Sequence, residues 1–324
     1  MNNPIETHDK QRLEHFPVSI FSIVMGLSGL AIAWQKAHLV LGGPDLVWQS
    51  IAGLASALFV TLVVIYAIKI LRYPNAVAAE WKHPVRVNFF PTISIGLLLL
   101  GIVWLETAPS LSRLLWASGT LIHLAFTFAI LSSWMYHTHY DIKHANPAWF
   151  IPVVGNLFVP ICGVHFAPPE LAWFFFSIGM IFWIVLMTIV FYRIIFHEPI
   201  AARLQPTLFI LLAPPAVGFI AYGSLVSELD GFGRVLYYTA LFLTLLLGSN
   251  VLRFIRGGFF LSAWAYSFPL AAMTIASFAM AKRSGLDFFH GIAVVLLAIV
   301  SLVVVVLIAK TLSAVRRHAI CVPE

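Results

Sequence analysis

The sequence predicts an all-α polytopic membrane protein with ten transmembrane helices. Hydrophobic residues make up 61% of the 324-residue chain and charged residues only 10%, against roughly 25% charged residues in a soluble domain. Apolar stretches of about 20 residues, long enough to cross a bilayer as a helix, recur along the chain. Because the segments between them are too short to bury a core of their own, we expect residues 1–324 to form a single transmembrane domain with short tails at 1–15 and 313–324.

Each predicted span is an apolar stretch bounded by polar or turn-forming residues. The ten spans are 16–37, 47–71, 87–106, 111–136, 148–166, 171–196, 206–226, 232–254, 259–280 and 288–312. The connections are short, so consecutive spans are expected to lie antiparallel as five helical hairpins. The first stretch is too long for the core of a signal peptide and is therefore expected to be retained as a span.

The basic residues are divided unevenly between the two sides of the predicted membrane domain. If the N-terminus is cytoplasmic, 14 of the 19 Lys and Arg residues lie inside and 5 outside, whereas the 13 acidic residues divide 7 to 6. The positive-inside rule therefore predicts that both termini are cytoplasmic. The net charge of +6 is then mainly a signal of topology, and we expect no nucleic-acid partner. Cys162 and Cys321 are expected to be unpaired thiols.

Prolines inside the spans occur only in the odd-numbered ones. They include Pro17, Pro91, Pro152, Pro160, Pro214, Pro215 and Pro269. A proline inside a helix removes a backbone hydrogen bond and kinks the helix, and in lipid the freed carbonyl group needs a partner. Since the odd helices all run in one direction, we expect them to form an inner, kinked ring in a quasi-fivefold arrangement around a central pore, with five straight helices outside. The alternative is a compact ten-helix bundle with a filled core.

Few side chains inside the spans could carry chemistry. No Asp, Glu, Lys or Arg lies near the middle of a span, which argues against a proton relay built on buried carboxylates. His123 is the only histidine well inside a span, so a haem between paired histidines is not supported. His137, His139 and His144 have a spacing that could bind a metal but are expected in a solvated loop. Asn156 could line a channel or hydrogen-bond to another helix. We expect no enzymatic activity, no metal and no cofactor.

The charge distribution favours an anion path. Five parallel inner helices would direct their positive, N-terminal dipole ends to the cytoplasmic mouth. Basic loop residues are expected at the same end. They are Lys82, Arg86, Lys143, Arg203 and Arg256.

Five stretches of the chain are similar to one known family, the TehA-type tellurite-resistance/C4-dicarboxylate transporters, to which plant slow anion channels and fungal malate and sulfite transporters also belong. They are FPVSIFSIVMGLSGLAIAW (16–34), AEWKHPVRVNFFPTI (79–93), NPAWFIPVVGNLF (146–158), LFILLAPPAVGFIAYGSL (208–225) and WAYSFPLAAM (264–273). The resemblance extends in order over essentially the whole chain. The HPVR loop, the LAP of span seven and the Ser-Phe pair of span nine are its most specific motifs.

The resemblance implies ten helices around a central pore, commonly in a homotrimer with one pore per subunit. It also implies that a phenylalanine of span nine plugs the pore, and the matching residue is Phe268. Phe21 and Phe158 match further pore-facing aromatic residues. The kink pattern and the resemblance together predict a pore lined by Phe21, Phe158, Pro91, Pro152, Pro160, Pro214, Pro215 and Pro269. The chain departs from bacterial members in having Pro rather than Gly after Phe268, and in this it is similar to the plant channels.

The sequence therefore predicts a channel or exporter for small inorganic or organic anions, in the lipid bilayer of a bacterial inner membrane, with Phe268 closing the pore. A proton-coupled carrier of C4-dicarboxylates or sulfite is the first alternative. A membrane enzyme or redox protein that uses the histidines of 137–144 is the second. A role in tellurite resistance is linked to the family by name and could be a side effect of anion movement.

Overall fold

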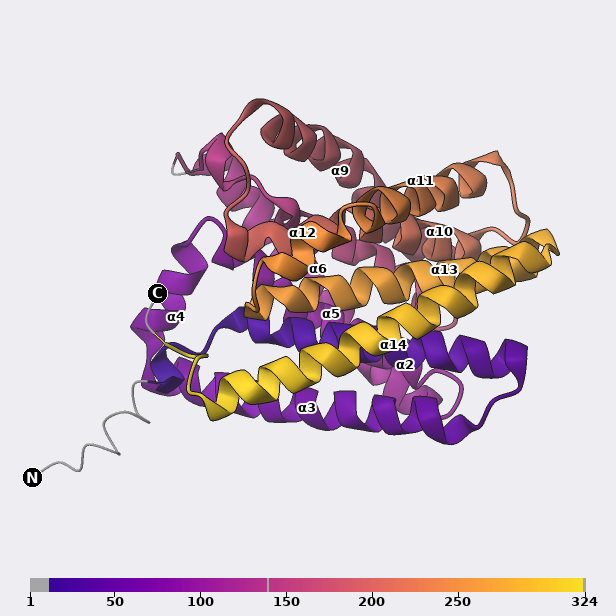
Figure 1. The fold of residues 1–324 in the computed structure, drawn as a ribbon, viewed down its shortest axis with the longest axis horizontal. Coiled ribbons are helices and arrows are strands. Elements are labelled where there is room, and N and C mark those ends of the chain that lie inside the picture. The colour runs from indigo at the N-terminus through magenta and orange to yellow at the C-terminus, as the bar shows by residue number, and fades with distance from the viewer. Residues whose placement is uncertain (1–11, 139, 323–324) are drawn as a thin grey trace, which may run out of the picture.

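The computed structural model describes residues 12–138 and 140–322, and within these residues every regular element is helical. Residues from both ends of this part of the chain, Glu14 and Val322, line one cavity, and the two ends of the described part lie on the same side of the bundle (Figure 1). We call this side the terminal face and the other side the opposite face. Most of the predicted tail 1–15 lies outside the described residues, and the last helix extends four residues into the predicted tail 313–324, to Arg316.

The even-numbered spans form long helices that are nearly all continuous. They are α3 (Asp45–Arg72), α6 (Pro109–Tyr136), α9 (Pro169–Phe196), α11 (Gly231–Gly248) with α12 (Val251–Arg256), and α14 (Asp287–Arg316). The prediction of five straight helices is wrong for the eighth span, which is interrupted after Gly248. There the side chains of Ser249 and Asn250 both donate to the Leu246 carbonyl, at 2.8 and 3.0 Å, and so compete with the backbone for that acceptor.

The odd-numbered spans begin as 3₁₀ helices and continue as α-helices. They are η1 (Val18–Phe21) with α2 (Ser22–Leu41), η2 (Arg86–Phe89) with α5 (Pro91–Val103), η6 (Ala202–Leu212) with α10 (Ala213–Leu225), and η7 (Leu261–Tyr266) with α13 (Ser267–Ser284). The fifth span consists of four short pieces, η4 (Pro147–Phe150), α7 (Ile151–Val154), η5 (Gly155–Leu157) and α8 (Phe158–Gly163). Two further short helices, α4 (Pro74–Lys82) and η3 (Ile142–His144), lie in connections. Nine helices in the described part of the chain are long enough to span a membrane, and the fifth span, Pro147–Gly163, is a shorter tenth.

The ten spans are arranged as two concentric rings. The inner helices contact one another in a closed circle, α2 to α5, α5 to α8, α8 to α10, α10 to α13, and α13 back to α2. Each inner helix also contacts the outer helix that follows it in the chain, as α13 does with α14 in Figure 1. The predicted all-α membrane fold, with five hairpins in a quasi-fivefold ring, is confirmed.

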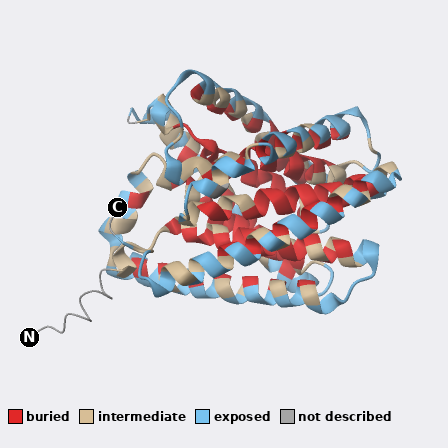
Figure 2. Cartoon of the chain, in the orientation of Figure 1, coloured by how far each residue is buried: buried red, intermediate tan, exposed pale blue. Residues whose placement is uncertain are grey.

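Burial separates the two rings. In the four longer inner spans 67–83% of the apolar window is buried, and in the five outer spans 28–39%. Figure 2 shows the buried residues concentrated along the central helices and the exposed ones along the outside. The exposed outer side chains are largely apolar, such as Leu245 and Leu302 at 66% and 65% exposure, as lipid contact requires.

The prolines do not kink continuous α-helices, so that part of the prediction is wrong. Each predicted pore-lining proline lies in the first three residues of an α segment: Pro91 of α5, Pro152 of α7, Pro160 of α8, Pro214 and Pro215 of α10, and Pro269 of α13. The first N–H groups of an α-helix have no intrahelical acceptor, so a proline there removes no such bond. The prolines therefore lie at the start of new α segments within the odd spans.

Side chains from α5 and α6 satisfy carbonyl groups at two of these breaks. Ser94 Oγ donates to the Pro91 carbonyl at 2.9 Å, and Thr127 Oγ1 lies 2.8 Å from the Pro152 carbonyl. Asn156 Nδ2 donates to Thr127 Oγ1 at 3.1 Å, so Asn156 bonds across helices. His123 Nδ1 lies 2.9 Å from Ser94 Oγ. Ser94 and Asn156 of the inner ring thus both contact side chains of the outer helix α6.

Candidate functional site

Two cavities enter the inner ring from its two ends. The cavity at the terminal face has a volume of about 960 Å³ and the one at the opposite face about 630 Å³. Exposed residues such as Arg203 and His165 line their respective mouths. Three residues line both cavities: Phe158, Val217 and Phe268. These three buried apolar side chains form the wall between the cavities.

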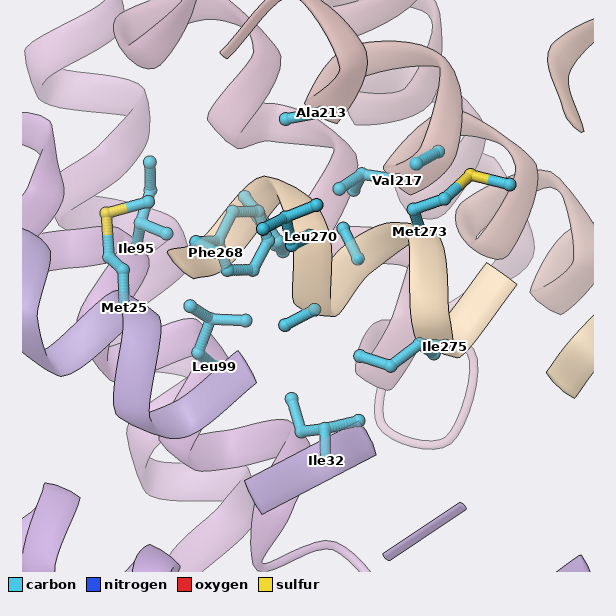
Figure 3. Packing of buried hydrophobic residues seen from close by; sticks show 14 of the residues in the cluster. Met25, Ile32, Ile95, Leu99, Ala213, Val217, Phe268, Leu270, Met273 and Ile275 are labelled. Atoms are coloured by element: carbon cyan, nitrogen blue, oxygen red, sulfur yellow. The ribbon is translucent and has the colours of Figure 1, made fainter. Parts of the chain in front are cut away.

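Phe268 lies at the centre of this wall. Its side chain is 6% exposed, and its ring meets the ring of Phe158 edge-on, with 5.3 Å between centroids and 65° between planes. Figure 3 shows the Phe268 ring between Ile95 and Met25 on one side and Val217 on the other. Gly29 leaves room for this ring, since a Cβ atom there would lie 3.0 Å from Phe268 Cδ2. The three side chains that line both cavities are thus apolar and uncharged.

The junction of η7 and α13 determines where Phe268 lies. Ser267 Oγ donates to the Trp264 carbonyl at 2.6 Å, and Trp264 Nε1 donates to Thr311 Oγ1 of α14 at 3.0 Å. On the other side α2 approaches so closely that a Cβ atom on Gly26 would lie 2.1 Å from Ser267 Oγ. Ser267, the residue before Phe268, is therefore held by Trp264 and by the close approach of α2, and Trp264 is in turn bonded to the outer helix α14.

The cavity at the terminal face is mainly basic. Five of its lining residues are Lys or Arg and two are acidic. The basic residues are Lys69, Arg86, Arg203, Lys310 and Arg317, and the acidic ones are Glu14 and Glu80. Of the basic residues predicted at the cytoplasmic mouth, Arg86 and Arg203 line this cavity, and Lys82, Lys143 and Arg256 do not. A basic mouth raises the local concentration of anions.

A buried ion pair supports the wall of the same cavity. Lys69 Nζ of α3 lies 2.7 Å from Glu80 Oε2 of α4, with side chains 1% and 6% exposed. Lys69 Nζ also donates to the Phe16 carbonyl at 2.8 Å, and Glu80 accepts from the Tyr66 hydroxyl at 2.9 Å and from Val18 N–H at 3.2 Å. The pair therefore ties an outer helix and a connection to the first turn of the inner ring.

The cavity at the opposite face has a different charge pattern. Its charged lining residues are Lys36, Arg283 and Glu106, with His165 beside them. Gln35 lines it as well and donates from Nε2 to the Val103 carbonyl at 3.3 Å. This cavity therefore carries one net positive charge from its lining residues when His165 is neutral.

Four of the nine residues predicted to gate or line the pore contribute to the cavities: Phe158, Phe268, Pro214 and Pro269. The other five are described residues that line neither cavity: Phe21, Pro91, Pro152, Pro160 and Pro215. Phe21 packs outward against Phe59 and Tyr66 of α3, with 6.0 Å between centroids in each case.

Sequence reasoning missed Val217, Gly29 and the Lys69–Glu80 pair. Val217 lies one helical turn after the Pro214-Pro215 pair, and such an interval could have identified it as a residue on the same face. Gly29 follows Gly26 at helical spacing, which is a signal of close helix approach. No pattern identifies the ion pair, because Lys69 ends one span and Glu80 lies in a connection.

The histidine cluster offers no metal site among the residues that the structure describes, where no group of three potential ligands occurs. His139 lies outside those residues. Instead, His144 Nδ1 accepts from Asp141 N–H at 3.1 Å as part of a capping arrangement around η3.

Comparison with known proteins gives a consistent result over nearly the whole chain. A family model described as voltage-dependent anion channel, SLAC1, matches residues 15–312. The S-type anion channel SLAH3 of Arabidopsis thaliana is 31% identical over 309 residues, which are 93% of this chain and 48% of the relative. The guard cell S-type anion channel SLAC1 of the same plant is 26% identical over 280 residues, 83% of this chain and 50% of the relative. This chain thus spans about half the length of these plant relatives.

A bacterial relative matches over most of its own length. The tellurite resistance protein TehA homolog of Haemophilus influenzae is 28% identical over 300 residues, 89% of this chain and 86% of the relative. The resemblance drawn from the sequence motifs is confirmed, and these named relatives are channels or a resistance protein, in agreement with the prediction that the chain is not an enzyme.

Proposed function

Because the chain belongs to the voltage-dependent anion channel family, we propose that it conducts small anions across a membrane through its two cavities, with Phe268 as the gate between them. The observation that carries this proposal is that Phe268 lines both cavities. Displacing this one ring, together with a small adjustment of Phe158 and Val217, would join the cavities into a continuous path.

An apolar constriction of this kind can block ions without any charged group. A narrow passage walled by aromatic and aliphatic side chains neither replaces the hydration shell of an ion nor holds water, so it opposes conduction until it widens. Phe158, Val217 and Phe268 offer no polar side-chain atom to a passing ion. The closed state is therefore steric and hydrophobic.

The electrostatics support anions over cations. The terminal-face cavity has five basic and two acidic lining residues. First-turn residues of four inner α-helices also line it, namely Ser22 of α2, Thr92 of α5, Ala213 of α10 and Phe268 of α13. Since the positive ends of these helix dipoles face the cavity, a cation entering from this side meets an unfavourable potential and an anion a favourable one.

In this proposal the protein is a multi-pass protein of a bacterial inner membrane whose terminal face is cytoplasmic. The excess of basic residues at that face supports the orientation. The expected homotrimer, with one pore per subunit, stays a prediction.

The test is a voltage-clamp comparison of the wild type with Phe268→Ala, in chloride, nitrate, sulfite and malate in turn. We expect a weak wild-type current and a rise of at least about tenfold in the variant, which corresponds to a barrier lower by ~1.4 kcal/mol. Phe21→Ala is the matched control, because Phe21 is a buried aromatic residue of the first inner span and lines neither cavity. A Phe268→Ala variant that reaches the membrane in normal amount and conducts no better than the wild type would refute the gate. Saturable uptake that follows a pH gradient would favour the carrier alternative.

A further inference from the structure

Arg283 is held at the opposite-face cavity by the loop that follows α10. Its Nη2 donates to the carbonyl oxygens of Ser227 and Glu228 at 2.7 and 3.3 Å, and also to that of Val226. Three carbonyl groups from one loop thus engage a single guanidinium nitrogen. Because the guanidinium group is planar and rigid, these bonds determine the direction of its other nitrogen as well.

The other terminal nitrogen, Nη1, lacks an acceptor. It is shielded from solvent and makes no hydrogen bond within the described residues. It lies against Gly223, where an added Cβ atom would come within 2.8 Å of it, and both residues line the opposite-face cavity. A buried cationic N–H group without an acceptor is costly. The absence of a side chain at Gly223 leaves room for Nη1 itself at the cavity wall.

Lys36 supplies a second cation to the same cavity. It lies on α2, which packs against α13, the helix that carries Arg283. No hydrogen bond or ion pair within 4 Å involves its ammonium group among the described residues, and the charged groups that act on it are Glu106 and Lys282. Glu106 is the only carboxylate among the residues lining the cavity.

Two further acidic residues near Arg283 do not line the cavity: Glu228, whose backbone carbonyl Arg283 contacts, and Asp230, which already has partners. Asp230 accepts from Gly233 N–H at 2.8 Å and from the Tyr222 hydroxyl, and these bonds lower the pKa of its carboxyl group. Asp230 does not line the cavity. The cavity therefore presents two cationic groups with free N–H donors against one carboxylate.

We propose that the opposite-face cavity contains a binding site for a small monovalent anion, in which Arg283 Nη1 donates a hydrogen bond and Lys36 adds a second positive charge to the cavity lining. The net charge of the lining, two cations against Glu106, matches one negative charge. The inference rests on the proposed function, in which this site is the position of the permeating anion on the outer side of Phe268. Charge-assisted hydrogen bonds from guanidinium and ammonium groups are well suited to a halide or a small oxyanion.

The experiment measures conductance in the Phe268→Ala background while chloride is titrated separately on each side of the membrane. Lys36→Gln is expected to raise the half-saturating chloride concentration at the opposite face by about three- to tenfold and to leave that at the terminal face unchanged. Lys282→Gln is the matched control, since it removes an exposed charge next to Arg283 at the end of α13, outside the cavity. Equal half-saturating concentrations in the Lys36→Gln and Lys282→Gln variants would overturn the site.

Two further measurements keep this test separate from that of the gate. Chloride line broadening in nuclear magnetic resonance reports binding to the purified wild type whether or not it conducts. We expect less broadening with Lys36→Gln than with Lys282→Gln, and no difference would refute the site even if the channel proposal holds. Arg283→Gln should weaken binding in the same way. Because that change also releases the loop carbonyls, its result counts only if the thermal unfolding temperature is that of the wild type.

Discussion

The inner and outer rings are both built from apolar sequence but differ in backbone regularity. Outer helices such as α3, α6 and α9 run unbroken for 28 residues, whereas every inner span changes between 3₁₀ and α geometry. An unbroken helix satisfies its backbone groups within itself and can therefore face lipid. A broken one needs partners, and it is tolerated only where protein or a water-filled cavity covers it. The inner helices can thus place helix ends and the Phe268 side chain in the middle of the bundle, because the outer helices shield them from lipid.

Lys69 shows that the outer helices also stabilise the inner ring through a buried ion pair. It projects from α3 into the bundle and holds Glu80 beside the first turn of the inner ring. In Lys69→Gln the Glu80 carboxylate stays buried without its cation, and we expect a loss of ~3–5 kcal/mol in unfolding free energy. Lys143 forms an ion pair with Asp141 in which the lysine side chain is 69% exposed, so Lys143→Gln should lower the unfolding free energy by only ~0–1 kcal/mol. Thermal unfolding in detergent, followed by tryptophan fluorescence, compares the two variants, and similar losses would remove this role for α3.

The second prediction compares packing in the two rings. Leu98 of α5 is fully buried, and Leu302 of α14 is 65% exposed. We expect Leu98→Ala to destabilise the protein by about 3 kcal/mol, since it leaves a cavity in a close-packed interior. Leu302→Ala should change stability by about 0.5 kcal/mol or less, because lipid replaces the lost contacts. The same unfolding assay measures both. Comparable effects would mean that α14 is covered by protein rather than lipid, as a subunit interface would require.

The smallest effect is expected at the glycines. A Cβ atom on Gly26 would lie 2.1 Å from Ser267 Oγ and 2.9 Å from Ser267 Cβ, whereas Gly53 on α3 has nothing within 4 Å. Gly26→Ala should therefore cost ~1–3 kcal/mol through overpacking, and Gly53→Ala should be neutral or stabilising by up to ~1 kcal/mol. Since Ser267 adjoins Phe268, we also expect a higher basal current in Gly26→Ala. An unchanged current with lowered stability would show that the α2–α13 contact does not position the gate.

Much of the fold could be predicted because the membrane imposes simple rules on sequence. Span length and hydropathy located all ten helices, and the restriction of prolines to odd spans separated the rings. The sequence did not show that each of these prolines lies at the start of an α segment. The 3₁₀ turns before the prolines and the α turns after them have similar apolar composition, so the boundary between them leaves no pattern in the sequence. The interruption at Ser249 and Asn250 was missed for a related reason, since two polar residues near a helix end are common and rarely break it.

The candidate site was less predictable than the fold. Phe268 was identified from its resemblance to a family, not from its own chemistry, since it is one of 27 phenylalanines and most of these serve packing. Phe21 also matched a pore-facing aromatic residue of the family, yet its ring packs against α3. The direction of a side chain depends on the rotation of its helix, and in a helix that is apolar on all sides no sequence pattern defines that rotation.

The sequence by itself determined the number of spans, the hairpin order and which helices lie inside, because each of these follows from local hydropathy and from where proline is tolerated. Only the tertiary structure decided that Phe268, Phe158 and Val217 meet between two cavities, that Lys69 reaches Glu80, and that Arg283 and Lys36 share the opposite cavity. Those pairings join residues from different helices, and they depend on helix rotation and close approach, which arise when all ten helices pack together.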